Sequence, residues 1–226
     1  MTAEVAAPAM RGLHIAFTGV DGAGKSTQAV RLCRRLGAEG FVANLVEDKG
    51  TFGIDLLRSV AARHGQAPRP YFGHRVTDVV KALEMLRDNA ERIRPLVERG
   101  EIAVVPRSGF CRLAIAAIED PESVPLVDAI VHLAGRPDLV LFLDTPPEEC
   151  LARVEARGEQ GRVDELSAFA ERLREVARSG RVMRIAGDAS ADEVHERVWN
   201  ALRPTLLRRR DGLRIAGPVE GPATWV

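Results

Sequence analysis

Residues 19–27 read Gly-Val-Asp-Gly-Ala-Gly-Lys-Ser-Thr and fit the pattern G-x-x-x-x-G-K-[ST]. A glycine-rich loop of this kind points successive backbone N–H groups at a phosphate, and the N-terminus of the next helix adds its positive dipole end. In such a loop Lys25 would bridge the β- and γ-phosphates of a nucleotide, and the Ser26 hydroxyl would bind Mg²⁺. We call residues 19–27 the phosphate loop and predict that it binds a nucleoside triphosphate.

The sequence around the phosphate loop fits this prediction. A strand-like apolar run over 13–18 precedes it, and a helical pattern starts at Lys25. The alternative, a glycine-rich turn without a ligand, does not require this strand-loop-helix order. The residues expected to contact the nucleotide are Gly19, Asp21, Gly22, Ala23, Gly24, Lys25, Ser26 and Thr27.

Composition narrows the class of protein. The chain has 226 residues, 28% of them charged, and a formal net charge of zero, so it lacks the global basic field expected of a protein that mainly binds nucleic acid. Its three cysteines have no metal-ligand spacing and favour a reducing compartment. We find no signal peptide and no apolar run long enough to span a membrane. The expectation is a cytoplasmic protein with one domain over 12–207, a flexible N-terminus over 1–11 and a C-terminal tail over 208–226.

Short apolar runs alternate with longer amphipathic ones, which is typical of an α/β protein with a parallel sheet. Five strands are predicted, over 13–18, 42–46, 102–105, 139–143 and 182–185. Helices are predicted over 25–36, 54–62, 76–99, 147–157, 165–178 and 192–207, with a weaker one over 126–133. Residues 65–70 are expected to separate two helices, and the tail is expected to be disordered or to cross the surface loosely.

In an open parallel sheet, ligands bind beyond the carboxyl ends of the strands. Besides the phosphate loop, four segments follow predicted strands and carry polar residues, namely 47–51, 106–108, 144–145 and 187–190. Asp144 has a plainer interpretation, because it could cap the helix that starts near Pro147. The sequence therefore predicts one site assembled from these five strand ends.

With these positions identified, the chain resembles the thymidylate kinases among the P-loop nucleotide kinases. The resemblance covers most of 12–203. It rests on the phosphate loop with Gln28, the run 92–100 leading into the third strand, the run 143–148 leading toward Arg153 and Arg157, and the run 187–194. It implies a three-layer P-loop kinase fold with a five-stranded parallel sheet flanked by helices, ATP and Mg²⁺ as cofactors, and a homodimer packed through long helices.

The resemblance also implies roles for particular side chains. Asp21 would contact the acceptor or a metal-bound water, although local hydrogen bonding within the loop is an alternative. A mobile lid is expected near 157–164, and three arginines would close over the donor phosphates and stabilise the transferred group, namely Arg153, Arg157 and Arg162. A plain surface position is the alternative for each of these arginines.

The acceptor half of the site departs from the family pattern. Val46 stands where the family has an arginine before the acid, here Glu47, and Pro106 replaces the aspartate before Arg107. The base-stacking phenylalanine aligns with Met85 and the base-contacting arginine with Asn89, while Ser108 replaces a tyrosine. The residues expected to bind the acceptor are Glu47, Met85, Asn89 and Arg107. The alternative is a surface role for Glu47 and a buried structural ion pair for Arg107.

Three functions are compatible with these observations. The first is an ATP-dependent nucleoside monophosphate kinase with an altered acceptor pocket, acting on a small-molecule phosphate acceptor and neither on nucleic acid nor at a membrane. The second is a kinase of a non-nucleotide metabolite, and the third is a non-catalytic ATP-binding protein, suggested by the carboxylate missing at Pro106.

Overall fold

The computed structural model describes residues 11–47, 52–178 and 182–215. The strands are β1 (Leu13–Thr18), β2 (Ala43–Leu45), β3 (Ile102–Val105), β4 (Leu139–Asp144) and β5 (Met183–Ala186). The helices are α1 (Lys25–Ala38), α2 (Phe52–Ala62), α3 (Pro68–Asp88), η1 (Asn89–Ile93), α4 (Arg94–Glu98), α5 (Gly109–Glu119), η2 (Pro121–Ser123), α6 (Val124–Ala134), α7 (Pro147–Glu155), α8 (Val163–Ala177), α9 (Ala191–Arg209) and η3 (Arg210–Gly212).

The five strands form one sheet in the order β2-β3-β1-β4-β5, and every neighbouring pair is parallel. The central strand β1 pairs with β3 through Leu13 and Ile102, and with β4 through Ile15 and Leu139. All carboxyl ends therefore lie at one edge of the sheet. The strand order reverses on either side of β1, so the loop after β1 lies at a topological switch point, where such sheets bind their ligands.

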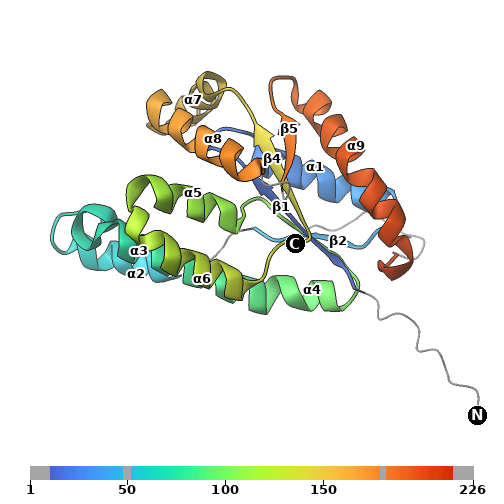
Figure 1. Ribbon diagram of the computed structural model, residues 1–226, viewed down its shortest axis with the longest axis horizontal. Helices are drawn as coiled ribbons and strands as arrows, with labels where there is room; N and C mark the ends of the chain where they lie inside the picture. The colour runs from blue at the N-terminus through green and yellow to red at the C-terminus, as the bar shows by residue number, and fades with distance from the viewer. Residues whose placement is uncertain (1–10, 48–51, 179–181, 216–226) are drawn as a thin grey trace, which may run out of the picture.

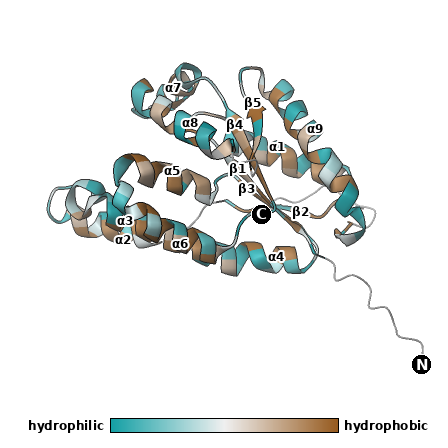
Figure 2. Cartoon of the chain, in the orientation of Figure 1, coloured by the Kyte–Doolittle hydropathy of each residue, from teal (hydrophilic) through white to brown (hydrophobic). Residues whose placement is uncertain are grey.

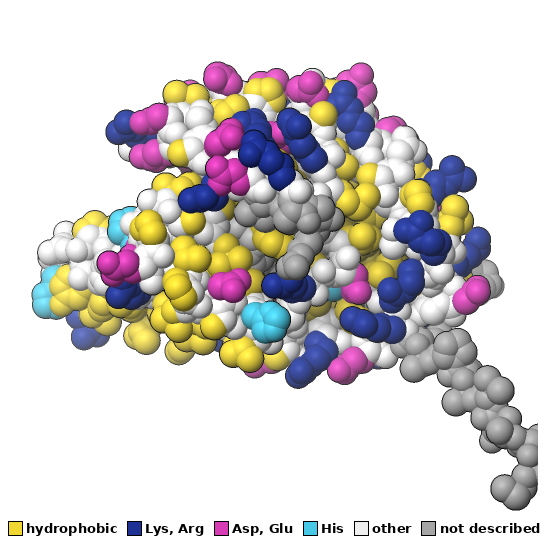
Figure 3. Space-filling view, viewed as in Figure 1, with side chains coloured by type: hydrophobic (Ala, Val, Ile, Leu, Met, Phe, Trp, Pro, Cys, Tyr) yellow, Lys and Arg dark blue, Asp and Glu magenta, His cyan; other side chains and the backbone are white. Residues whose placement is uncertain are grey.

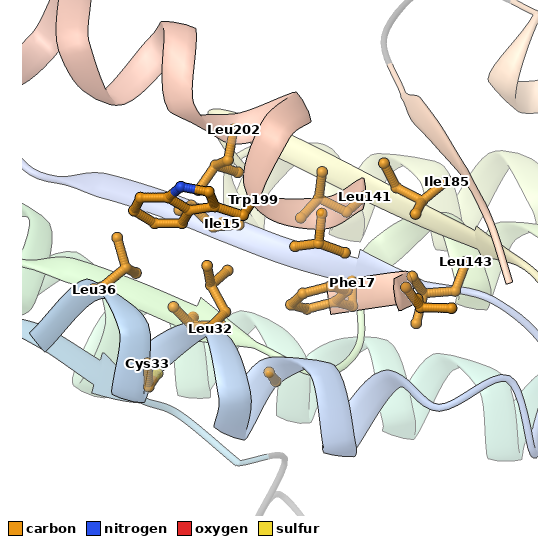
Figure 4. Close-up of a cluster of buried hydrophobic side chains, with 14 of the residues drawn as sticks. Ile15, Phe17, Leu32, Cys33, Leu36, Leu141, Leu143, Ile185, Trp199 and Leu202 are labelled. Atoms are coloured by element: carbon orange, nitrogen blue, oxygen red, sulfur yellow. The ribbon is translucent and has the colours of Figure 1, made fainter. Parts of the chain in front are cut away.

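Helices cover both faces of the sheet (Figure 1). On one face, α1 and α9 bury the larger core, which includes Phe17 of β1, Leu141 of β4 and Trp199 of α9 (Figure 4). On the other face, α4, α5 and α8 pack on β1, β3 and β4. Because both faces are covered, the central strands are largely apolar, and they appear mostly brown at the centre of Figure 2. The predicted three-layer α/β fold is confirmed.

A further group of helices extends one side of the molecule. The long helix α3 packs against α2, α5 and α6, and its Ala82 shares a small core with Ala116 of α5 and Ile130 of α6. Gly73 interrupts α3 with a left-handed backbone, φ 79°. This arrangement places one face of α3 and one face of α5 opposite each other beside the carboxyl edge of the sheet.

The predicted strands are confirmed to within a residue at each end, but three segments differ from expectation. Helix α5, over Gly109–Glu119, was not predicted, because it starts with glycine and reads as an almost continuous apolar run rather than an amphipathic one. The break expected over 65–70 is shorter, since Pro68 already starts α3. The single helix expected over 76–99 is divided by η1 into three parts, because η1 has π-helical hydrogen bonding.

The segment 208–215 was expected to belong to a loose tail, and this is wrong. Helix α9 continues to Arg209, Leu213 is buried in the larger core, and Ile215 forms an antiparallel bridge with Phe41 beside β2. Arg214 pairs with the buried Glu101. Hydrophobic burial of Leu213 and this ion pair hold the segment on the edge of the sheet; residues 216–226 lie outside the described part of the chain.

Helix α9 begins with a complete capping box, in which the Ser190 hydroxyl accepts from the backbone N–H of Glu193 and the Glu193 carboxylate accepts from the backbone N–H of Ser190. This fixes the turn after β5 at the carboxyl edge. None of the helices in the described ranges combines the length and the apolar character needed to cross a membrane.

Candidate active site at the carboxyl edge of the sheet

The phosphate loop joins the end of β1 to the start of α1 and depends on its glycines. Gly22 and Gly24 both have positive φ, 86° and 93°. A Cβ atom on Gly22 would lie 2.2 Å from the carbonyl oxygen of Cys150, so a side chain does not fit there. Helix α1 has no side-chain cap at Gly24. No side chain therefore caps its first N–H groups, which leaves them available to an anion, as a binding site at a helix N-terminus requires.

Lys25 lies under the loop and is 6% exposed. Its Nζ donates to the carbonyl oxygens of Gly19 at 2.9 Å and Val20 at 2.7 Å, and lies 3.6 Å from Oδ1 of Asp21. Burial lowers the pKa of Lys25 from its usual value. The ammonium group is thus held by dipoles of the loop, next to the place where phosphate oxygens would be bound.

An ion pair connects the phosphate loop with the end of β3. Arg107 Nη2 donates to Asp21 Oδ1 at 3.1 Å. Burial acts to raise the pKa of Asp21, but the charges of Lys25 and Arg107 outweigh it and hold that pKa below its usual value. Asp21 is therefore a carboxylate at neutral pH, and the predicted residues Asp21, Lys25 and Arg107 do come together.

The phosphate loop opens onto a cavity of about 410 Å³. Its lining includes most of the predicted nucleotide contacts together with groups from the other strand ends, namely Asp21, Gly22, Gly24, Lys25, Ser26, Thr27, Glu47, Pro106, Arg107 and Arg157. Gly19 and Ala23 do not line this cavity; their carbonyl oxygens accept from Lys25 and from Thr145. Residues 48–51 of the predicted segment after β2 lie outside the described residues.

The donor set suits magnesium bound together with phosphates. In the described ranges no three or more His, Cys, Asp or Glu side chains are grouped to hold a metal ion by themselves. Magnesium needs no such cage, since it binds through one or two protein oxygens, substrate phosphates and water. The Ser26 hydroxyl and the Asp21 carboxylate line the cavity and provide such oxygens.

The three arginines that were predicted to close over the donor phosphates occupy different places. Arg153, in the last turn of α7, donates to the carbonyl oxygen of Gly22 at 3.3 Å and pairs with Glu149. Arg157 lines the phosphate cavity and pairs with Glu159. It follows the end of α7 at Glu155 instead of lying within that helix.

Arg162 does not line the phosphate cavity. It is exposed and pairs with Asp164 at 2.6 Å. The structure thus brings two of the three predicted arginines to the phosphate loop.

Thr145 and Asp144, at the end of β4, have structural roles that sequence reasoning missed. The Thr145 hydroxyl donates to the carbonyl oxygen of Ala23 at 3.2 Å and so supports the phosphate loop. Asp144 does not cap α7, whose first turn has no side-chain cap. Instead it accepts from Arg174 at 2.9 Å and Arg184 at 2.5 Å, because a buried carboxylate needs such partners.

A second cavity of about 180 Å³ adjoins the first, with Glu47 and Arg107 in the lining of both. Three of the four residues expected to bind the acceptor line it, namely Glu47, Met85 and Arg107. Asn89 does not; it lies in η1 and lines a smaller cavity of about 70 Å³, which shares Met85 and Arg107 with the second one. Arg107 thus stands where these cavities meet.

Two cations of the second cavity were not predicted, Lys81 of α3 and Arg112 of α5. Lys81 is one of only three lysines in the chain, with Lys25 and Lys49, and this rarity was an available signal. Arg112 lies on the helix that the sequence pattern did not reveal, so its position could not be anticipated.

Comparison with known proteins agrees with this geometry. The thymidylate kinase family model matches residues 17–198. The chain is 29% identical over 209 residues to a probable thymidylate kinase of Pyrococcus abyssi, covering 88% of this chain and 99% of the relative. It is 35% identical over 190 residues to the thymidylate kinase of Gluconobacter oxydans (81% and 84% covered) and 36% over 196 residues to that of Caulobacter vibrioides (81% and 92%). The chain therefore belongs to the thymidylate kinase family and is an ATP-dependent phosphotransferase of the P-loop kinase type.

Proposed function

We propose that this protein is a nucleoside monophosphate kinase whose acceptor pocket differs from that of the thymidylate kinases. The observation that carries the proposal is the cavity shared by Lys25, Ser26 and Arg107, since donor and acceptor phosphates can meet only where groups for both are present. An oxygen of the acceptor phosphate would form a bond to the γ-phosphorus of ATP while the bond to ADP breaks, giving a nucleoside diphosphate and ADP.

Phosphoryl transfer of this kind depends on alignment and on offsetting charge, because the transition state is loose and the protein has little covalent chemistry to do. In this proposal Lys25 and the loop N–H groups hold the donor, and Arg107, anchored by Asp21, holds the acceptor phosphate. Arg153 and Arg157 stabilise the transferred group. Magnesium, held by Ser26 and the phosphates, would neutralise the developing charge.

Residue types around the acceptor support a difference from thymidylate. Val46, where the family has an arginine, and Pro106, where it has an aspartate, remove a phosphate ligand and a carboxylate. Met85 and Ser108 line the second cavity without offering an aromatic ring. Charge-assisted bidentate hydrogen bonds and ring stacking are strong contributions to holding a pyrimidine nucleotide. Thymidine monophosphate should therefore bind weakly.

The acceptor is tested by transfer from γ-labelled ATP and Mg²⁺ to a series of nucleoside monophosphates at millimolar concentration. We expect label in the nucleoside diphosphate fraction for at least one of them, and slow transfer to thymidine monophosphate. The Lys25→Met variant provides the background rate. Robust turnover of thymidine monophosphate would refute the altered pocket, and nucleotide binding without any transfer would favour a non-catalytic ATP-binding protein.

We further propose that the protein is a homodimer that pairs through α3 and α6. Large apolar side chains are exposed on these helices, among them Leu83 of α3 and Leu126 and Leu133 of α6, the last being 73% exposed. Figure 3 shows hydrophobic side chains gathered in this region, where Figure 1 places α3 and α6. Exposed patches of this kind mark interaction surfaces.

Sedimentation equilibrium tests this proposal, because it measures the molar mass of the protein in solution. The wild-type chain should sediment as two chains and the Leu133→Glu variant as one, because a charge in an apolar interface is not compensated. Leu207→Glu is the matched control, since Leu207 is also exposed but lies on α9. A monomeric wild type, or a dimer unaffected by Leu133→Glu, would show that this face is not the interface.

A further inference from the structure

Two positively charged side chains face the acceptor side of the site from opposite helices. Lys81 of α3 and Arg112 of α5 both line the second cavity together with Met85 and Arg107. They also line an adjoining, wider cavity of about 730 Å³, which Asp21, Arg69 and Arg107 share. Both side chains are half-buried. The two adjoining cavities are thus lined by Arg107 beside the phosphate loop and by two further cations, Lys81 and Arg112.

The other cations of this region have anionic partners. Arg107 pairs with Asp21 at 3.1 Å, and Arg69 pairs with Glu119 at 2.5 Å and lies 3.6 Å from Asp78. In the part of the chain that the structure describes, no salt bridge or side-chain hydrogen bond is made by either Lys81 or Arg112. The second cavity is also lined by the acids Glu47, Glu84 and Asp88. Asp88 pairs with Arg92, and Glu84 accepts from the backbone N–H of Gly53. Glu119 pairs with both Arg69 and His74.

The pKa of Lys81 reflects its burial and the charges of its neighbours, including Arg112. Its pKa is lowered to about 8, first by burial and then by the positive charges of Arg112 and Arg69, whereas the negative charges of Asp78 and Glu119 act in the opposite direction. Lys81 is therefore mostly charged at pH 7. Two half-buried cations held close together repel each other and lose hydration, and an anion bound between them would relieve both costs.

We propose that the acceptor carries a second acidic group, bound by Lys81 and Arg112, in addition to the phosphate that Arg107 holds. This inference rests on the proposed kinase function and names the substrate class more closely. Arg107 is tied to the phosphate loop through Asp21, whereas Lys81 and Arg112 lie on α3 and α5. The second acid is therefore at the end of the acceptor remote from the transferred phosphoryl group. The class is a nucleoside monophosphate with a carboxylate on its base or a second phosphate on its sugar.

Acceptors that differ by one acidic group test this proposal. Thymidine monophosphate is compared with 5-carboxy-2′-deoxyuridine 5′-monophosphate, uridine 5′-monophosphate with orotidine 5′-monophosphate, and each 5′-monophosphate with its 3′,5′-bisphosphate. The carboxylate and bisphosphate arms distinguish the two sources of the charge. At pH 7 we expect kcat/KM to be about 10-fold or more higher for one class of acid-bearing acceptor, the usual effect of a hydrogen bond to a charged group.

Charge-removing variants assign that preference to the two side chains. Lys81→Gln and Arg112→Gln should each reduce the preference about 10-fold, and Lys81→Arg should retain it. Arg87→Gln, which removes a charge from the exposed surface of the same helix, should leave the preference unchanged. Acid-bearing acceptors that react no better than their partners, or a preference that survives both glutamine variants, would overturn the proposal.

If the protein is not a nucleotide kinase, the result is different: the wild-type protein transfers no phosphoryl group to any nucleotide. In that case calorimetric titration with the same nucleotide pairs measures their affinities and still tests whether Lys81 and Arg112 bind a second acidic group. The wild-type protein should bind the acid-bearing member more tightly than Lys81→Gln does. Equal affinities in the two proteins would overturn it.

Discussion

The Lys25→Met variant should transfer the γ-phosphoryl group about 10²–10³-fold more slowly than the wild-type protein, because it lacks one preorganised donor for charge that develops during transfer. Methionine is an unbranched, uncharged side chain one heavy atom shorter than lysine, and it suits the buried position. Lys25 Nζ donates to two carbonyl oxygens of the phosphate loop, and both would lose this donor. Single-turnover transfer from γ-labelled ATP measures the rate of the chemical step.

Arg34→Met is the matched control for this experiment. Arg34 lies on the same helix, α1, but is exposed and does not line the phosphate cavity. Its replacement should leave the rate unchanged. Thermal unfolding of the Lys25→Met variant shows whether the fold is retained, and an unchanged transfer rate in a folded Lys25→Met protein would refute the assignment of the phosphate loop.

The Phe17→Ala variant should lose about 3–5 kcal/mol of the free energy of unfolding, the range found when a buried phenylalanine leaves a cavity. Phe17 is completely buried on the central strand β1, between α1 and α9 (Figure 4). A close-packed site between a sheet and two helices cannot collapse around the missing ring. Urea unfolding followed by circular dichroism measures this loss.

The same substitution at an exposed position separates burial from side-chain chemistry. Phe52 is 71% exposed at the start of α2, and Phe52→Ala should change the free energy of unfolding by about 0.5 kcal/mol or less. Equal losses in the two variants would mean that Phe17 does not occupy a tightly packed core.

The layered fold could be predicted from sequence because its signals are local. A strand buried on both faces reads as a short apolar run, as in Ile102–Val105, and the phosphate loop has fixed spacing between glycines and lysine. Both signals lie within a few residues of the chain. The meeting of Asp21, Lys25 and Arg107 followed from the rule that parallel strands end at one edge of the sheet.

The acceptor side could not be predicted to the same degree, because it depends on how helices pack. Met85 and Asn89 were expected to serve one ligand, and both line the smaller cavity, but only Met85 also lines the second one. Lys81 and Arg112 meet because α3 packs on α5. No local pattern encodes this contact between residues 31 positions apart.

Leu213 and Ile215 have a consequence for the order in which the protein is made. The larger core includes Leu213 together with Leu13 of the first strand, and Ile215 bridges to Phe41 beside the edge strand β2. A ribosome must therefore synthesise almost all of the described chain before this core is filled and that edge is covered. Until then the nascent chain exposes an open sheet edge and apolar surface, the features that promote association with other chains. Packing of the segment 213–215 is thus the last step in folding of the described chain during its synthesis.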